Sequence, residues 1–138
     1  MISYNYETEF NLDNETLLTN WINKVVESHN CAIQEVNYIF VDDEYQHKLN
    51  VEFLNHDTLT DIISFDYSVG NNLQGDIYIS VERVADNAKD FKVSFTEEMH
   101  RVLIHGILHY CGFKDKSDEE AKLMRSMENE ALSLWLNK

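Results

Sequence analysis

The sequence predicts an α+β fold, in which a four-stranded mixed sheet packs against helices. Segments with the apolar pattern of strands and segments with the apolar spacing of helices follow one another in the order β-α-β-α-β-β-α-α-α. The chain has 138 residues, which is the size of one domain. Proline is absent and glycine occurs four times, and no linker is evident. We therefore expect a single domain over residues 1–138.

Four segments have the pattern of β-strands. At the start of the chain Ile2, Tyr4 and Tyr6 alternate with polar residues. Later segments carry apolar runs, such as the one from Tyr38 to Val41. The polar stretch from Gly70 to Asn72 separates the last two segments and predicts an antiparallel hairpin. The predicted strands are residues 2–9, 35–41, 61–67 and 75–81.

Five segments have the spacing of helices. In the first, apolar pairs recur every four residues after Asp13, which is suited to cap the helix. Near the C-terminal end, Ser94 with Glu97 and Ser117 with Glu120 form two capping-box patterns. The predicted helices are residues 14–29, 42–54 and 82–91, one from Ser94 to Gly112, and one from Ser117 to about Leu136.

Charge is unevenly distributed along the chain. The formal net charge is −14, which argues against a general nucleic-acid binder, because phosphate contacts need Lys and Arg. Residues 1–82 hold two basic and fifteen acidic residues, whereas residues 83–138 hold nine and ten. Any basic surface would thus be local and lie in the second part. No apolar run reaches the ~18 residues of a membrane span, and no secretory signal pattern is present, so we expect a cytoplasmic protein.

The most informative stretch runs from His105 to Asp115. His105 and His109 are four residues apart, so on a helix their Cβ atoms lie about 5–6 Å apart, and both imidazoles can reach one ion at ~2.0–2.1 Å. Gly112 then ends the helix, and the turn can bring the Asp115 carboxylate to the same ion. Three protein ligands leave a fourth position for water, as in catalytic zinc sites. The sequence therefore predicts one divalent metal ion, zinc, held by His105, His109 and Asp115, with a C-terminal helix after this metal-binding helix.

Other interpretations of these residues stay open. Two histidines at this spacing also occur as buried, hydrogen-bonded residues without a metal. A zinc peptidase would carry His-Glu-x-x-His with the glutamate as general base, and Gly106 occupies that position here. Glu98 can share the helix face of the histidines, but a solvated acid in the first turn fits it better. No general base is evident, and Asp61, Ser64 and Asp76 suit cleft, capping or turn positions equally.

Several sequence blocks resemble the YbeY family of endoribonucleases, which are bacterial rRNA maturation factors. The stretch from His105 to Phe113 follows the family signature His-Gly-x-Leu-His-x-x-Gly-Tyr, with Phe113 in place of the tyrosine. Further blocks match in order and at similar spacing across residues 36–130. They are Leu49-Asn50-x-x-Phe53, Thr60 to Phe65, Gly75 to Ser80, and Asp118 to Ala121 with Met124 and Glu128.

The resemblance implies a metal-dependent endoribonuclease that cuts single-stranded RNA in maturing the 3′ end of 16S rRNA. The cofactor expected from the ligand set is one zinc ion per chain, with another divalent metal as the alternative. The implied partners are single-stranded rRNA and the ribosome or its small-subunit proteins, and neither DNA nor a membrane is expected. One alternative is a non-catalytic ribosome-assembly factor, in which a structural metal pins the last helices to the body. A weaker alternative is another metal-dependent hydrolase such as a peptidase.

Two positions depart from the family pattern. Asp115 stands where the family has a third histidine, and its negative charge should weaken polarisation by the ion and favour harder metals such as manganese. Leu54 stands where the family has an arginine that is thought to bind the substrate phosphate. Lys114 and Lys116 flank the site in sequence and could supply the positive charge instead, although solvated surface positions also suit them.

Overall fold

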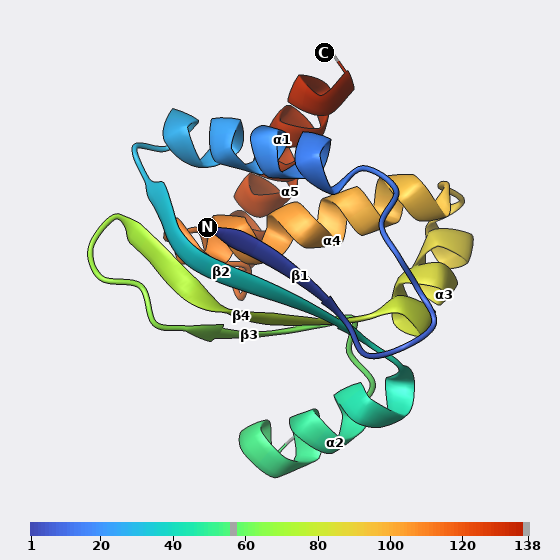
Figure 1. The fold of residues 1–138 in the computed structure, drawn as a ribbon. Helices are drawn as coiled ribbons and strands as arrows, with labels where there is room; N and C mark the ends of the chain where they lie inside the picture. Colours follow the sequence, from blue (N-terminus) through green and yellow to red (C-terminus); the bar gives the residue numbers. More distant parts are fainter. Residues whose placement is uncertain (56–57, 137–138) are drawn as a thin grey trace.

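The computed structural model describes residues 1–55 and 58–136. Within them the predicted order of elements and the α+β class are confirmed (Figure 1). The strands are β1 (Ile2–Tyr6), β2 (Ala32–Val41), β3 (Ile62–Asp66) and β4 (Asn72–Ser80). The helices are α1 (Glu15–Ser28), α2 (Asp43–Leu54), α3 (Val81–Phe91), α4 (Phe95–Tyr110) and α5 (Asp118–Leu136). No helix in this described part is both long and apolar enough to cross a membrane.

The predicted boundaries are correct to within a few residues, with two differences. The first strand ends at Tyr6, not at residue 9. Asp13 does not cap α1, because the residue before the helix is Asn14, whose side chain makes no capping hydrogen bond. Ser94 does cap α4, since its side chain accepts a hydrogen bond from the backbone N–H of Glu97.

The four strands form one mixed sheet in the order β1-β2-β4-β3. β1 is parallel to β2 and β2 is parallel to β4, whereas β3 is antiparallel to β4. This last pair is the predicted hairpin, and its turn contains Gly70 at φ +59, a conformation that glycine adopts without strain. Helices α1, α4 and α5 lie on one side of the sheet and α2 lies on the other (Figure 1).

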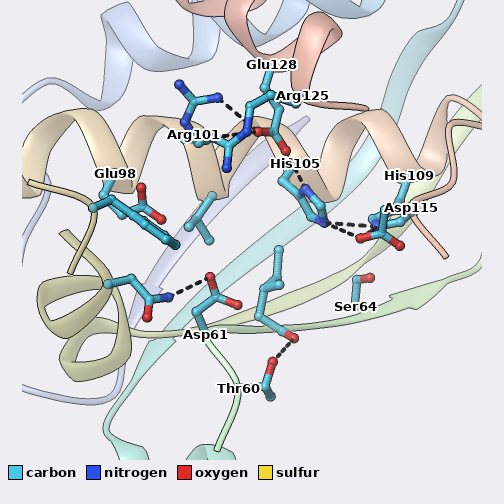
Figure 2. Close-up of a pocket in the computed structure, with 14 residues that line it drawn as sticks. Thr60, Asp61, Ser64, Glu98, Arg101, His105, His109, Asp115, Arg125 and Glu128 are labelled. Atoms are coloured by element: carbon cyan, nitrogen blue, oxygen red, sulfur yellow. Dashed lines mark hydrogen bonds and ion pairs between the residues drawn. The ribbon is translucent and has the colours of Figure 1, made fainter. Parts of the chain in front are cut away.

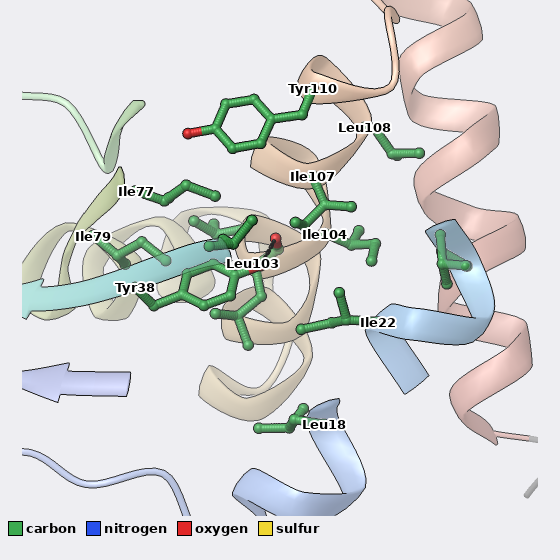
Figure 3. Close-up of a cluster of buried hydrophobic side chains, with 14 of the residues drawn as sticks. Leu18, Ile22, Tyr38, Ile77, Ile79, Leu103, Ile104, Ile107, Leu108 and Tyr110 are labelled. Carbon is green, nitrogen blue, oxygen red and sulfur yellow. Dashed lines mark hydrogen bonds between the residues drawn. The ribbon is translucent and has the colours of Figure 1, made fainter. Parts of the chain in front are cut away.

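The core lies between the sheet and helices α1 and α4 (Figure 3). On α4, Leu103, Ile104 and Ile107 are fully buried, and such side chains each contribute about 1.5–3 kcal/mol when they leave water. The Tyr38 hydroxyl of β2 donates a hydrogen bond to the Leu103 carbonyl at 2.8 Å. These contacts fix α4 on the central strands. The face of α4 that does not pack on the core is therefore held at a defined position beside β3.

Two glycines allow α4 to approach the sheet closely. A Cβ atom on Gly106 would lie 3.1 Å from a methyl carbon of Ile62 and of Ile77, so position 106 faces the sheet. Gly75 in β4 leaves room for the ring of Tyr110, whose hydroxyl donates a hydrogen bond to the Phe65 carbonyl at 2.8 Å. These contacts fix the C-terminal half of α4 against β3 and β4.

Candidate metal site and adjoining pocket

A pocket with a volume of about 490 Å³ opens beside α4 (Figure 2). Its lining comes from the start of β3, the end of α3, one face of α4, the loop after α4, and α5. On α4 the lining residues Glu98, Arg101, His105 and His109 follow at steps of three, four and four residues, which places them in a row on one face of the helix. The pocket therefore extends along α4 from Glu98 to His109.

The three predicted metal ligands meet at one end of this pocket. The Nε2 atoms of His105 and His109 are 3.0 Å apart, and Asp115 Oδ2 lies 3.3 Å and 3.4 Å from them. Ligand atoms around a tetrahedral ion, at bond lengths of ~2.0–2.2 Å, are separated by roughly 3.3–3.6 Å, so these three atoms fit one ion. Gly112, at φ +105, ends α4 and lets Asp115 return to the helix. Within the described residues this is the only such group of three.

Glu128 of α5 orients one of these histidines. Its Oε2 atom accepts a hydrogen bond from Nδ1–H of His105 at 2.6 Å, and its Oε1 atom accepts one from Nη1 of Arg101 at 3.0 Å. The side chain is buried, with 5% exposed. A histidine that donates Nδ1–H to a carboxylate keeps the Nε2 lone pair for a metal ion. This arrangement turns Nε2 of His105 toward His109 and Asp115.

The electrostatics of this pair favour positive charge at the imidazole. Burial by itself raises the pKa of Glu128, but hydrogen bonds from His105 and Arg101 outweigh burial and lower it. Burial by itself lowers the pKa of His105, whereas the hydrogen bond and negative charge of Glu128, together with Asp115, raise it. The carboxylates thus stabilise a cationic centre, whether a proton or a metal ion carries the charge.

Glu98 corrects one expectation from the sequence, since it is not a solvated first-turn acid. Only 4% of Glu98 is exposed, because α3 and α5 both pack against α4. Burial raises the pKa of its carboxyl, and the negative charge of Asp61 raises it further. The amphipathic pattern of α4 could not show this, because Glu98 is covered by the neighbouring helices α3 and α5, and the pattern within one helix does not tell how other helices pack on it.

Of the three other residues that the sequence suggested for the cleft, two line the pocket and one does not. Asp61 and Ser64 line the pocket, and the Asn87 side chain donates a hydrogen bond to Asp61 Oδ2 at 3.3 Å. Asp76 does not line it, because its side chain accepts a hydrogen bond from Asn37 of the neighbouring strand at 3.0 Å. The alternation of side chains along a strand explains why Asp76 is on the other face.

Arginines, and not Lys114 or Lys116, carry the positive charge of the pocket. Arg101 and Arg125 line it, whereas Lys114, Lys116 and Leu54 do not. The Arg101 side chain is 16% exposed and is bound to Glu128, whereas Arg125 is 54% exposed and lies 3.7 Å from the same carboxylate. The sequence did not predict this arrangement, because it depends on the packing of α5 on α4, which places Arg125 in the same pocket as the histidines.

Comparison with known proteins identifies the family. The family model described as Endoribonuclease YbeY matches residues 2–135. This chain belongs to the YbeY endoribonuclease family. Two relatives named Endoribonuclease YbeY illustrate the match. The one from Flavobacterium johnsoniae is 66% identical over 98% of this chain and 97% of its own length. The one from Bacteroides fragilis is 46% identical over 84% of each chain.

A solved structure supports the fold. The solution structure of a Thermotoga maritima protein matches with a TM-score of 0.68 and 28% identity, over 99% of this chain and 93% of that one. YbeY family membership supports an endoribonuclease function, that is, a nuclease that hydrolyses RNA. The peptidase alternative loses support, since position 106, where a peptidase has its glutamate, faces Ile62 and Ile77 of the sheet.

Proposed function

We propose that this chain is a metal-dependent endoribonuclease that cuts single-stranded RNA and acts, in the cytoplasm and with the ribosome, in maturing the 3′ end of 16S rRNA. The proposed cofactor is zinc, held by His105, His109 and Asp115. The main support is the spacing of 3.0, 3.3 and 3.4 Å between the three ligand atoms, at the end of an open pocket. Membership of the YbeY family supports RNA as the substrate.

The residues of the pocket have separate roles in this proposal. When bound, the ion would acidify a water molecule and polarise the scissile phosphate. His105 and His109 would hold it through Nε2 and Asp115 through a carboxylate oxygen, which leaves one position open. Glu128 keeps His105 aligned. Arg125, which is more exposed than Arg101, offers positive charge to the RNA backbone.

The test uses zinc-loaded protein, free of other nucleases, and a single-stranded RNA that contains the precursor 3′ end of 16S rRNA. We expect cleavage that a chelator abolishes and added zinc restores. His109→Ala should abolish it. His47→Ala should retain it, because His47 lies on α2 outside this pocket. Intact RNA after incubation with zinc-loaded wild-type protein would contradict the proposed activity.

A structural metal in a non-catalytic assembly factor would use the same contacts. Asp115 belongs to the loop after α4, and Glu128 ties α5 to α4 through His105, so an ion here would also hold these elements together. That function would be supported if His105→Ala unfolds the protein while the wild-type protein shows no turnover. Circular dichroism during heating, measured beside the cleavage assay, separates the two functions.

A further inference from the structure

The end of the pocket away from the metal site contains a buried carboxylate without a hydrogen-bond donor. Glu98 lies two helical turns before His105, lines the pocket (Figure 2) and is 4% exposed. Among residues 1–55 and 58–136, none donates a hydrogen bond to its carboxylate, whereas Asp61 receives one from Asn87. The oxygens of Glu98 are not among the fully buried atoms without a partner, so they open into the pocket, while the burial of the rest of the residue leaves the charge poorly solvated. The position of this carboxylate in the pocket lining points to a ligand that supplies hydrogen-bond donors to it.

An exposed aromatic ring lines the same end. Phe91 is the last residue of α3 and is 58% exposed. Lys92, at φ +58, ends α3, and the short connection to the Ser94 cap holds Phe91 near the first turn of α4. Asn87 lies four residues before Phe91 and also lines the pocket. An aromatic ring beside a side chain with free hydrogen-bond acceptors is an arrangement by which proteins bind unstacked nucleobases.

The pattern of acceptors on Glu98 selects among the four bases. A carboxylate offers two acceptor oxygens side by side. Guanine presents two adjacent donors, N1–H and N2–H, on its Watson–Crick edge. Adenine, cytosine and uracil each place an acceptor beside their donor on that edge, so the second carboxylate oxygen would meet a lone pair.

We propose that Glu98 and Phe91 form a subsite for an unpaired guanine of the RNA. The ring of Phe91 stacks on the base, and the Glu98 carboxylate accepts hydrogen bonds from N1–H and N2–H. The inference rests on the proposed function, which places RNA in this pocket. Arg101 lies between Glu98 and His105 on the pocket face of α4, where the backbone that joins this guanine to the scissile phosphate would pass.

The first test measures binding of RNA to the zinc-loaded full chain by fluorescence anisotropy. The probes are short labelled oligouridine RNAs whose central base is guanine, inosine or uracil, and a gel verifies that each RNA stays intact. We expect the guanine probe to bind roughly tenfold more tightly than the uracil probe. Inosine should bind less tightly than guanine, because it lacks the N2 amino group. Equal affinity for the three probes would overturn the proposal.

Two variants test the contact with Glu98. Glu98→Gln should lose the preference for guanine, because the amide replaces one acceptor with a donor. Glu97→Gln is the matched control, since Glu97 is exposed on the same helical turn, and it should keep the preference. Circular dichroism verifies that both variants are folded. A guanine preference that survives Glu98→Gln would overturn the assignment.

Stacking on Phe91 is tested separately. Phe91→Leu should weaken binding of the guanine probe by roughly tenfold, and Phe91→Trp should restore it because the indole ring also stacks. Tyr67→Leu is the control, since Tyr67 is an exposed aromatic residue outside this pocket. Unchanged affinity in Phe91→Leu would overturn the role of the ring.

The outcomes separate this inference from the proposed nuclease activity. Cleavage of RNA by the wild-type protein without any guanine preference would overturn the subsite and leave the activity standing. Tight, guanine-selective binding without metal-dependent cleavage would overturn the proposed activity and leave the subsite standing.

Discussion

The carboxylate of Glu128 on α5 lies 2.6 Å from Nδ1 of His105 on α4. One hydrogen bond thus joins the C-terminal helix to a candidate metal ligand, and Arg101 secures the other oxygen of the same carboxylate. The orientation of His105 therefore depends on how α5 packs on α4.

Weakening the hydrogen bond between Glu128 and His105 should weaken metal binding. We expect Glu128→Gln to lower the affinity for zinc by about 10- to 100-fold, because the amide holds the imidazole less firmly and lowers its basicity. A competition titration with a chromophoric chelator measures the affinity. Glu130→Gln, an exposed position on the same helix, is the control. Equal affinity in Glu128→Gln and wild-type protein would exclude a role for Glu128 in the metal site.

Asp115 is the proposed metal ligand at which this chain departs from the family pattern. We expect purified Asp115→Ala to carry clearly less zinc than wild-type protein, because two imidazoles alone hold an ion weakly. Asp115→His should retain zinc. Elemental analysis by mass spectrometry measures the metal content, with the exposed residue Glu119 replaced by alanine as control. Equal content in Asp115→Ala and wild-type protein would remove Asp115 from the site.

Arg125 should contribute more to RNA binding than the lysines near the site in sequence. We expect Arg125→Gln to weaken binding of single-stranded RNA and to reduce the slope of log affinity against log salt by about 0.7, the loss of one phosphate contact. Lys116→Gln removes the same charge outside the pocket and should change the slope less. Titrations at several salt concentrations measure both variants, and equal slopes would contradict the prediction.

The buried carboxyl of Glu98 should make stability depend on pH. Its pKa is raised by burial and then by the charge of Asp61. A carboxyl whose pKa is raised on folding binds its proton more strongly in the folded state, so its contribution is fully present at low pH. That contribution is lost as the pH rises from the ordinary glutamate range through the raised pKa.

Glu98→Gln should therefore have a higher Tm than wild-type protein at pH 7. The difference should disappear below about pH 4, where Glu98 is protonated in both states. Thermal unfolding at both pH values measures the effect, and Glu97→Gln should show little change at either. A Tm for Glu98→Gln at or below the wild-type value at pH 7 would show that ionised Glu98 does not destabilise the folded state.

Gly75 should tolerate no side chain. A Cβ atom there would lie 2.3 Å from both the Phe65 carbonyl oxygen and the Tyr110 hydroxyl. We expect Gly75→Ala to lower the free energy of unfolding by about 3 kcal/mol, because α4 must move away from β4. Urea denaturation measures this loss. Gln74→Ala, at the preceding position of the strand, should cost much less, and an equal cost would contradict the steric explanation.

Local sequence patterns predicted the elements of this protein well. Strand alternation, capping residues such as Ser94 and the helix-ending Gly112 depend on interactions within a few residues, so they can be recognised along the chain. The spacing from His105 to His109 is of the same kind, because a helix sets it. The resemblance to the YbeY family depended instead on several sequence blocks that match in order across residues 36–130.

Tertiary packing decided which residues surround the candidate metal ligands. Glu98 has the pattern of a solvated acid, yet α3 and α5 bury it, and α5 brings Glu128 and Arg125 to α4. The packing of α4 against β3 also placed Asp61 in the pocket, whereas Asp76 projects from the other face of the sheet. By itself the sequence determined the elements and the spacing of the two histidines, because both follow from local backbone geometry. Only the tertiary structure decided which charges face those histidines, because these charges come from α5 and from the loop after α4, whose positions depend on how they pack against α4.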